Sequence, residues 1–248
     1  MSYESLTWLW IGIGGAAGLY LLRVPAPYGR HASAQWGPLI DNRLGWFLME
    51  VVVLVVFWGV ILASGRRPTG PALAMVLLFS LHYVHRALIF PLRLRTRGKR
   101  MPLVIAASAV AFNLVNGSLL GWHFGYRADY PAAWYRDPRF GVGLALFAVG
   151  MATNLWADRR LIGLRAPGQT GYSIPRGGLF ELVSCPNHLG EIVEWIGYAV
   201  LTWSLPGFAF AFWTAANLVP RALTHHQWYR ATFPDYPAGR KAVVPMAL

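Results

Sequence analysis

Seven long apolar runs divide the chain, and each has about the length of a helix that crosses a membrane. Each run ends at a charged residue or a proline, which are residues that stop an apolar helix. The predicted helices cover residues 5–22, 44–63, 71–92, 102–122, 141–157, 188–204 and 206–224. The pattern therefore predicts an all-α integral membrane protein, with residues 1–248 forming a single membrane-embedded domain.

The composition agrees with a membrane protein and excludes several other classes. Of 248 residues, 56% are hydrophobic and 13% are charged, whereas soluble domains carry about 25% charged residues. The 15% of aromatic residues exclude a disordered chain, and a single cysteine, Cys185, excludes a disulfide framework.

The distribution of basic residues predicts an orientation. The net charge is +12, and the bases lie in short clusters between the apolar runs, so we expect contact with anionic lipid headgroups rather than nucleic acid. With the N-terminus outside, sixteen of the 22 bases lie on the inner side and five outside. The positive-inside rule therefore predicts an outside N-terminus and a cytoplasmic C-terminus. Arginine outnumbers lysine twenty to two, which is typical of a GC-rich genome, and we expect a bacterial one. The membrane is then the bacterial inner membrane, or the endoplasmic reticulum in a eukaryote.

Residues 158–187 differ from the apolar runs because glycine and proline recur among scattered apolar side chains. So many helix breakers argue against a span, while the apolar residues argue against a disordered linker. We predict a folded cytoplasmic cap, and a long structured loop in a compact protein is usually functional.

Several polar side chains fall inside the predicted spans, where their cost makes each a candidate for function. Sets that share a helix face are His82, His85 and Arg86; Asn113 and Asn116; Asn154 and Asp158; Asn187, Glu191 and Glu194; and Arg221, His225 and Tyr229. Glu50 stands alone among apolar residues in the second span. The sets in the last three helices are expected to gather around the cap, where their donors and acceptors suit a large phosphorylated ligand.

Structural roles are open for some of these residues. Glu50 could pair with a base and fix helix packing, and Arg86 could extend to the headgroups. Asn113 and Asn116 are expected to form hydrogen bonds between helices. The pairs Gly14/Gly18 and Gly117/Gly121 are expected to be close-packing surfaces. No metal is expected, because no cysteine or carboxylate falls at ligand spacing from the histidines.

Longer motifs resemble the steroid 5-alpha-reductase (3-oxo-5-alpha-steroid 4-dehydrogenase) family. The resemblance is most specific in residues 171–206 and in the tail, residues 221–241. Shorter matches occur at Trp46–Glu50, at His82–Arg86 and at Asn154–Asp158. The resemblance runs from about residue 44 to the end, and the first 43 residues contribute nothing specific.

The resemblance implies a seven-helix enzyme that uses NADPH to reduce the carbon–carbon double bond of a 3-oxo-4-ene steroid. It implies that Glu50 and Tyr83 are catalytic and engage the steroid ketone. The implied substrate-binding residues are Glu50, Tyr83, Met49, Trp46 and Glu194. The implied cofactor-binding residues are Arg86, Asn154, Asp158, Arg165, Tyr172, Asn187, Glu191, Arg221, His225, Tyr229 and Arg240, with Lys99 or Arg100 as a further basic contact. The substrate side is expected mainly in the first four helices, and the cofactor side mainly in residues 154–241. Met49 stands where relatives often have Gln.

Other functions are compatible with parts of the pattern. A membrane methyltransferase of the isoprenylcysteine type has a comparable tail and binds S-adenosylmethionine, but Glu50 and the His82–Arg86 motif argue against it. A sterol or enoyl-lipid reductase, or a transporter, is a further alternative. The expected partners are an apolar steroid or enone lipid and the lipid bilayer, with no nucleic acid and no obligate protein partner.

Overall fold

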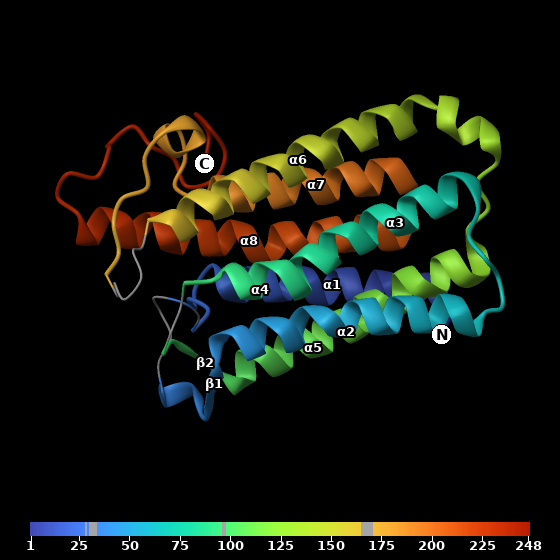
Figure 1. Cartoon of the computed structure of the whole chain (residues 1–248), viewed down its shortest axis with the longest axis horizontal. Coiled ribbons are helices and arrows are strands. Elements are labelled where there is room, and N and C mark those ends of the chain that lie inside the picture. The colour runs from blue at the N-terminus through green and yellow to red at the C-terminus, as the bar shows by residue number, and fades with distance from the viewer. Residues whose placement is uncertain (28, 30–33, 96–97, 165–170) are drawn as a thin grey trace. The chain divides into compact units, whose positions relative to one another are not determined.

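The computed structural model of the chain describes residues 1–27, 29, 34–95, 98–164 and 171–248 and is mostly helical (Figure 1). The α-helices are α1 (Tyr3–Leu21), α2 (Asn42–Ala63), α3 (Gly70–Val84), α4 (Phe90–Arg93), α5 (Leu103–Trp122), α6 (Pro138–Gly163), α7 (Pro186–Thr202) and α8 (Leu205–Thr232). Shorter 3₁₀ segments are η2 (Ala34–Trp36), η5 (Ala132–Arg136) and η6 (Gly178–Glu181), and π-helical turns are η3 (His85–Ile89) and η4 (His123–Arg127). A helix lies at each of the seven predicted places.

Four helical stretches are long and apolar enough to cross a membrane. They are Asn42–Ala63, Gly70–Arg93, Leu103–Arg127 and Pro138–Gly163. They correspond to the second, third, fourth and fifth predicted spans. By length and composition, this part of the prediction is confirmed, and the chain has the helices of a membrane protein.

Two helices extend well beyond the predicted spans. The carboxylate of Asp137 accepts a hydrogen bond from the backbone N–H of Arg139 at 2.8 Å, so α6 begins three residues early, and it continues to Gly163. Helix α8 continues to Thr232 although Pro220 lies within it. The apolar run covers only the part of a helix that suits lipid and not its polar end, which explains both differences.

The third predicted helix contains a turn that the sequence did not signal. Helices α3 and α4 are joined by η3, and the helical stretch is continuous from Gly70 to Arg93. Such π-helical turns are rare and often occur at functional sites. This one carries Arg86, a predicted cofactor residue.

The described chain forms two compact units, and residues 27–141 make up unit 2. Strands β1 (Leu39–Asp41) and β2 (Arg100–Pro102) pair antiparallel, a small ladder that the all-α prediction missed. Helices α2 and α5 each follow one of these strands and pack against each other.

The α2–α5 contact confirms two predictions about small and polar residues. A Cβ on Gly121 would lie 2.9 Å from the carbonyl oxygen of Phe57, and one on Gly117 would lie 3.1 Å from that of Val53. The side-chain amide of Asn113 donates to the carbonyl of Met49 at 2.6 Å and so links the two helices. The glycine pair is therefore a close-packing surface, and Asn113 bonds between helices. The side-chain amide of Asn116, predicted to do the same, donates to the carbonyl of Phe112 within α5 at 2.8 Å.

Unit 1 contains residues 1–26 and 142–248, so α1 belongs with α6, α7 and α8. Helix α1 packs on α8, with Gly14 against the Trp213 ring and Gly18 against Ala216. The indole N–H of Trp213 also donates to the carbonyl of Trp10 at 2.8 Å. Gly14/Gly18 is therefore the predicted close-packing surface, and the first helix groups with the later ones.

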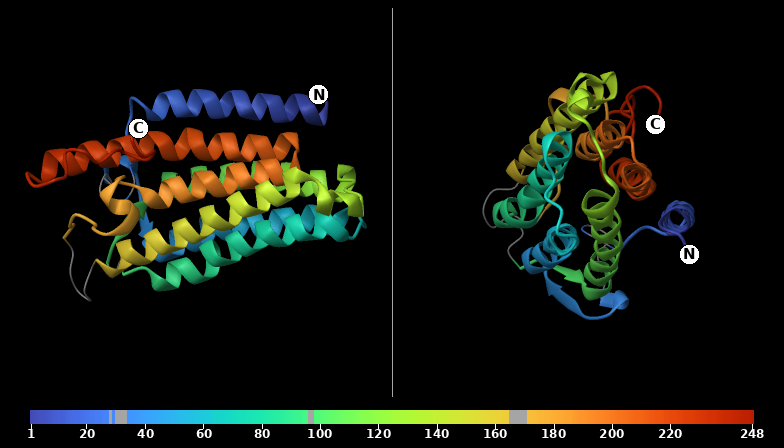
Figure 2. Two further views of the ribbon diagram at one scale, coloured as in Figure 1. Left: turned by 90° about the horizontal axis from the view of Figure 1, so that it is seen from above. Right: turned by 90° about the vertical axis from the view of Figure 1, so that its right-hand side faces the viewer.

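A seam of glycines joins α6 to α7, which run alongside each other (Figure 2). A Cβ on Gly150 would lie 2.6 Å from the carbonyl oxygen of Gly190, and one on Gly197 would lie 2.7 Å from that of Gly143. Real Cβ atoms do not come this close to backbone, so the helices touch main chain to main chain. The seven-residue spacing of Gly143/Gly150 and of Gly190/Gly197 is a sequence signal for this contact, which was not predicted.

Candidate functional site

Three predicted cofactor residues meet where α6 and α7 approach the cap. The side-chain amide of Asn154, on α6, donates to the carbonyl of Asn187 at 3.0 Å and to Oε2 of Glu191 at 3.3 Å. Asn187 and Glu191 lie in the first two turns of α7. Asp158 is buried one turn beyond Asn154. The α6–α7 contact therefore assembles a polar cluster from residues that are far apart in the sequence.

The last turns of α8 carry the next predicted residues at four-residue spacing. The rings of His225 and His188 lie 5.8 Å apart, which places His225 beside α7. The Tyr229 ring is buried and stacks on Tyr236, with centroids 5.3 Å apart. Arg221 is half-buried one turn before His225. The predicted common helix face is therefore present in unit 1.

The segment after α8 folds back onto the loop before α7 (Figure 1). Val183 and Lys241 form a parallel bridge, and the backbone N–H of Lys241 donates to the carbonyl of Leu182 at 2.9 Å. Ala242 and Val243 pack with Cys185 and Ala222 in a buried apolar cluster. The described part of the cap is therefore folded, as predicted, and the C-terminal segment is part of it.

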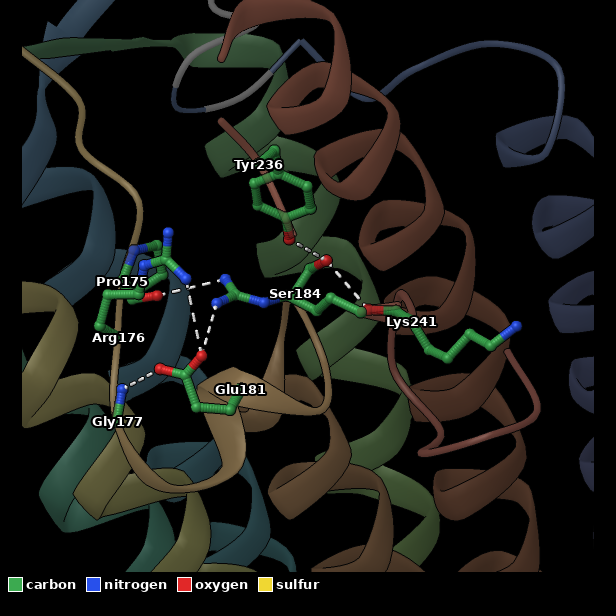
Figure 3. Close-up of polar contacts among 8 residues, drawn as sticks. Pro175, Arg176, Gly177, Glu181, Ser184, Tyr236 and Lys241 are labelled. Atoms are coloured by element: carbon green, nitrogen blue, oxygen red, sulfur yellow. Dashed lines mark hydrogen bonds and ion pairs between the residues drawn. The ribbon is translucent and has the colours of Figure 1, made fainter. Parts of the chain in front are cut away.

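Ser184 is the centre of the polar contacts in this region (Figure 3). Its hydroxyl lies 2.6 Å from the Tyr236 hydroxyl and 2.7 Å from Nδ1 of His226, and it donates to the carbonyl of Lys241 at 3.0 Å. The pKa of His226 is lowered from its usual 6.5, first by burial and then by the nearby positive charges of Arg230, Arg240 and Lys241. His226 therefore favours its neutral form.

Arg240 reaches the same region and is buried, with 2% of its surface exposed. Its Nη1 donates to the carbonyl of Pro175 at 3.2 Å, and its Nη2 lies 3.5 Å from Oε2 of Glu181 (Figure 3). Its Nε has no hydrogen-bond partner among the described residues. Tyr172, on the same stretch of loop as Pro175, lies against the Trp228 ring.

The other predicted cofactor residues fall elsewhere. Arg86 lies in unit 2, where its guanidinium is 4.9 Å from the Trp46 ring centroid and 4.5 Å from that of Phe90. Lys99 and Arg100 also lie in unit 2, at β2. Arg165 lies outside the described residues.

The two predicted catalytic residues both lie in unit 2. Glu50 is half-buried on α2, one residue after Met49, whose carbonyl bonds Asn113. Tyr83 is buried in the last turns of α3, beside the Phe79 ring. Helices α2 and α3 pack against each other.

Glu194, a predicted substrate residue, belongs instead to unit 1. It is 0% exposed, and its backbone faces Gly150 across the α6–α7 seam. The neighbouring Trp195 is buried against Phe147 and Phe210.

Some residues at this site were not singled out from the sequence. Ser184, Tyr236 and Glu181 make the contacts that hold the loop and the C-terminal segment together. All three lie within the motifs that resemble a known family, but neither helical spacing nor intramembrane position marks them. Their contacts join segments about 50 residues apart, which no local pattern reports.

Fold and site define a helical membrane protein with a polar cluster at the cap end of an α6–α7 pair. Residues 99–248 match the model of a protein family described as 3-oxo-5-alpha-steroid 4-dehydrogenase. The chain is 47% identical to 3-oxo-5-alpha-steroid 4-dehydrogenase 2 of Rattus norvegicus over 224 residues, which cover 89% of this chain and 87% of the relative. It is 43% identical to the steroid 5-alpha-reductase DET2 of Arabidopsis thaliana over 255 residues, covering 98% and 95% of the two chains. The chain belongs to the steroid 5-alpha-reductase family, whose members are oxidoreductases that act on CH–CH groups.

The family membership confirms the predicted resemblance and extends it. An alignment over 98% of the chain reaches into the first 43 residues, for which no specific resemblance was predicted. The methyltransferase and transporter alternatives are not favoured by these relatives. A bacterial origin stays a prediction.

Proposed function

We propose that this protein reduces the carbon–carbon double bond of a 3-oxo-4-ene steroid, or of a similar enone lipid, to the 5-alpha-dihydro product with hydride from NADPH. Family membership supports the reduction of a steroid double bond. The polar cluster of Asn154, Asn187 and Glu191 carries the assignment of a cofactor side, because predicted cofactor residues from two helices come together there.

The chemistry of the described residues fits a dinucleotide. An amide and a carboxylate suit ribose hydroxyls and a carboxamide, and guanidinium groups suit phosphates. Among the described residues, the buried Nε of Arg240 has no hydrogen-bond partner, which leaves one donor available. NADPH supplies a hydride when it is bound. The proposed cofactor-binding residues are Arg86, Asn154, Asp158, Arg165, Tyr172, Asn187, Glu191, Arg221, His225, Tyr229 and Arg240.

Glu50 and Tyr83 are the proposed catalytic residues. A protonated Glu50 and the Tyr83 hydroxyl each donate a hydrogen bond to the substrate carbonyl oxygen. Negative charge builds on that oxygen when hydride is added at the β carbon, and aligned donors stabilise it. Protonation at the α carbon completes the saturated ketone. Trp46, Met49 and Glu194 are proposed to contact the substrate.

The proposed setting is a multi-pass membrane protein with seven crossings, an outside N-terminus and a cytoplasmic C-terminus. An apolar steroid dissolves in the bilayer and reaches the helices from the lipid, while NADPH is a cytoplasmic molecule. The natural substrate is then a flat, apolar enone. A bacterial inner membrane is proposed, with the endoplasmic reticulum as its eukaryotic counterpart.

Replacing Glu50 tests this function. With full-length protein in detergent, a 3-oxo-4-ene steroid and NADPH, the wild type is expected to consume NADPH and to form a product two hydrogens heavier. Glu50→Gln removes the acid, so turnover is expected to fall by about 100-fold or more. NADPH affinity, measured by quenching of cofactor fluorescence, is expected to stay unchanged. Glu4→Gln, which changes an exposed carboxyl in α1, is the matched control and keeps wild-type turnover.

Two results contradict the proposal. A wild type that consumes no NADPH with any enone removes the reductase function. A Glu50→Gln variant that loses NADPH binding and thermal stability along with turnover makes Glu50 a residue of the fold.

A further inference from the structure

The Glu181 side chain joins three segments of unit 1. Its Oε1 accepts a hydrogen bond from the backbone N–H of Gly177 at 2.6 Å. Its Oε2 lies 3.5 Å from Nη2 of Arg240 and 3.7 Å from Nη1 of Arg176 (Figure 3). One carboxylate therefore connects the loop before η6, η6 itself and the C-terminal segment.

Arg240 depends on this contact because its charge is buried. The Arg240 side chain is 0% exposed, whereas that of Glu181 is 47% exposed. A guanidinium stays charged in proteins, and a buried charge is costly unless an opposite charge and hydrogen bonds compensate it. The Pro175 carbonyl and the face of the Tyr236 ring provide polar contacts. In the described part of the chain, Glu181 provides the carboxylate that lies within ion-pair distance of the Arg240 guanidinium.

The main chain of the C-terminal segment is held independently of Glu181. The backbone N–H of Ser184 donates to the carbonyl of Lys241 at 2.8 Å, and that of Cys185 donates to the carbonyl of Ala242 at 3.1 Å. Removing the Glu181 charge therefore leaves the path of the chain in place. What it releases is the side chain of Arg240.

The charge of Glu181 is stable at neutral pH. Its pKa is lowered from the usual 4.5, first by the Gly177 hydrogen bond and then by the positive charges of Arg240 and Arg176. The stabilising contribution of such a group is present above its usual pKa and is lost only as the pH falls through the lowered value. The ion pair therefore persists over the physiological range.

We propose that Glu181 is a positioning residue for the cofactor, which fixes the Arg240 guanidinium in the arrangement that binds NADPH. This rests on the proposed function, in which Arg240 is a cofactor-binding residue. Glu181 acts through Arg240 and does not touch the cofactor. The effect of Glu181 therefore falls on NADPH affinity, whereas Glu50 and Tyr83 serve the reduction step.

The test compares Glu181→Gln with Glu181→Asp and with a control, Asp235→Asn, which changes an exposed carboxyl on the same C-terminal segment. Full-length proteins in detergent are titrated with NADPH and assayed with a 3-oxo-4-ene steroid. Glu181→Gln is expected to raise both the Kd and the KM for NADPH about tenfold, the effect of losing one charge-assisted contact. The kcat at saturating NADPH is expected to stay within about twofold of wild type. Glu181→Asp restores the charge and recovers part of the affinity, and Asp235→Asn matches wild type.

Hydrogen exchange of the NADPH-free protein gives a readout that does not depend on activity. Glu181→Gln is expected to exchange faster at residues 175–181, where the contact of the Arg240 guanidinium with the Pro175 carbonyl is loosened, with residues 236–241 and the helices unchanged. Equal NADPH affinity and equal exchange in Glu181→Gln and wild type overturn the positioning role while leaving the reductase function intact. A parallel fall of kcat, affinity and thermal stability also overturns it, because Glu181 is then only structural. A wild type that binds no NADPH overturns the proposed function, and this inference with it.

Discussion

Ser184 shows how a small side chain can organise a site. Its hydroxyl contacts the Tyr236 hydroxyl, Nδ1 of His226 and the carbonyl of Lys241, all within 3.0 Å. A hydroxyl has one proton to donate and two lone pairs to accept with. The Ser184 proton goes to the Lys241 carbonyl, so Nδ1 of His226 and the Tyr236 hydroxyl both donate to Ser184. Protonation of His226 therefore adds a positive charge to a partly buried hydrogen-bonded group that already lies near Arg230, Arg240 and Lys241.

We predict that His226 makes the protein less stable as the pH falls. Because the folded-state pKa of His226 lies below 6.5, the unfolded chain takes up a proton first, and stability declines as the pH drops below 6.5. Melting curves of the wild type between about pH 7 and pH 5 are expected to show a falling Tm. His226→Gln keeps a neutral hydrogen-bonding group, so its Tm is expected to fall less over this range. Parallel curves for the two proteins would contradict the role of His226.

At the residue scale, the sequence predicted side chains whose position has a local cause. Asn154, on one helix face with Asp158, could be placed from helical spacing and from the cost of polar groups in lipid. The buried state of Arg240 could not, because it depends on Pro175, Glu181 and Tyr236, which come from other parts of the chain. Burial by distant segments leaves no periodic signal.

The α6–α7 pair is the best-defined contact among the elements of unit 1. Gly143 and Gly150 on α6 face Gly190 and Gly197 on α7 at spacings that leave no room for a side chain. Dispersion contacts and the close approach of backbones stabilise such pairs in lipid, where the hydrophobic effect does not act between helices.

We predict that Gly150→Ala destabilises this pair. Its new Cβ meets backbone atoms of Glu194 and Gly190, which cannot move as a flexible side chain would. The expected loss is about 1–3 kcal/mol of unfolding free energy, seen as a lower Tm in detergent. Gly141→Ala is the matched control, because its Cβ meets nothing within 4 Å, and it is expected to be neutral or stabilising by about 0.5–1 kcal/mol. Equal melting temperatures for the two variants would show that the seam tolerates a methyl group.

Among the elements, helices were predictable and irregular features were not. Apolar runs of membrane length located α2 and α5 because lipid demands continuous hydrophobicity. The three-residue strands β1 and β2 are too short to show alternation, and the π-helical turn η3 has the composition of an ordinary helix. The glycines of the α6–α7 seam are present in the sequence, but only the structure shows that those on α6 pack against those on α7.

For the whole molecule, we predict an orientation that a pair of fusions can test. The excess of basic residues in the predicted inner loops predicts a cytoplasmic C-terminus. Green fluorescent protein fused after residue 248 is expected to fluoresce in a bacterial host, and alkaline phosphatase at the same place is expected to be inactive. Fusions in the predicted outer loop, after Arg67, are expected to give the opposite pair of results. Active phosphatase after residue 248 would overturn the predicted orientation.

The organisation of the molecule was predicted in part. Family motifs and helix positions were accessible because they are written in contiguous residues. Which helices pack together could not be predicted. Helix α1 packs on α8, far away in the sequence, with Gly14 against Trp213 and Gly18 against Ala216. The pairs Gly14/Gly18 and Gly117/Gly121 each predict a surface for close helix packing, but the sequence does not show which helix packs there.

The glycine contact between α6 and α7 affects how much conformational entropy the protein loses when a ligand binds. With Gly150 and Gly190 in main-chain contact, α6 and α7 have no slack in which to slide, and they behave as one rigid body. Asn154, Asn187 and Glu191 sit on that body, so their mutual geometry is preorganised before a ligand arrives. In the proposed binding of NADPH at this cluster, the two helices therefore lose little conformational entropy.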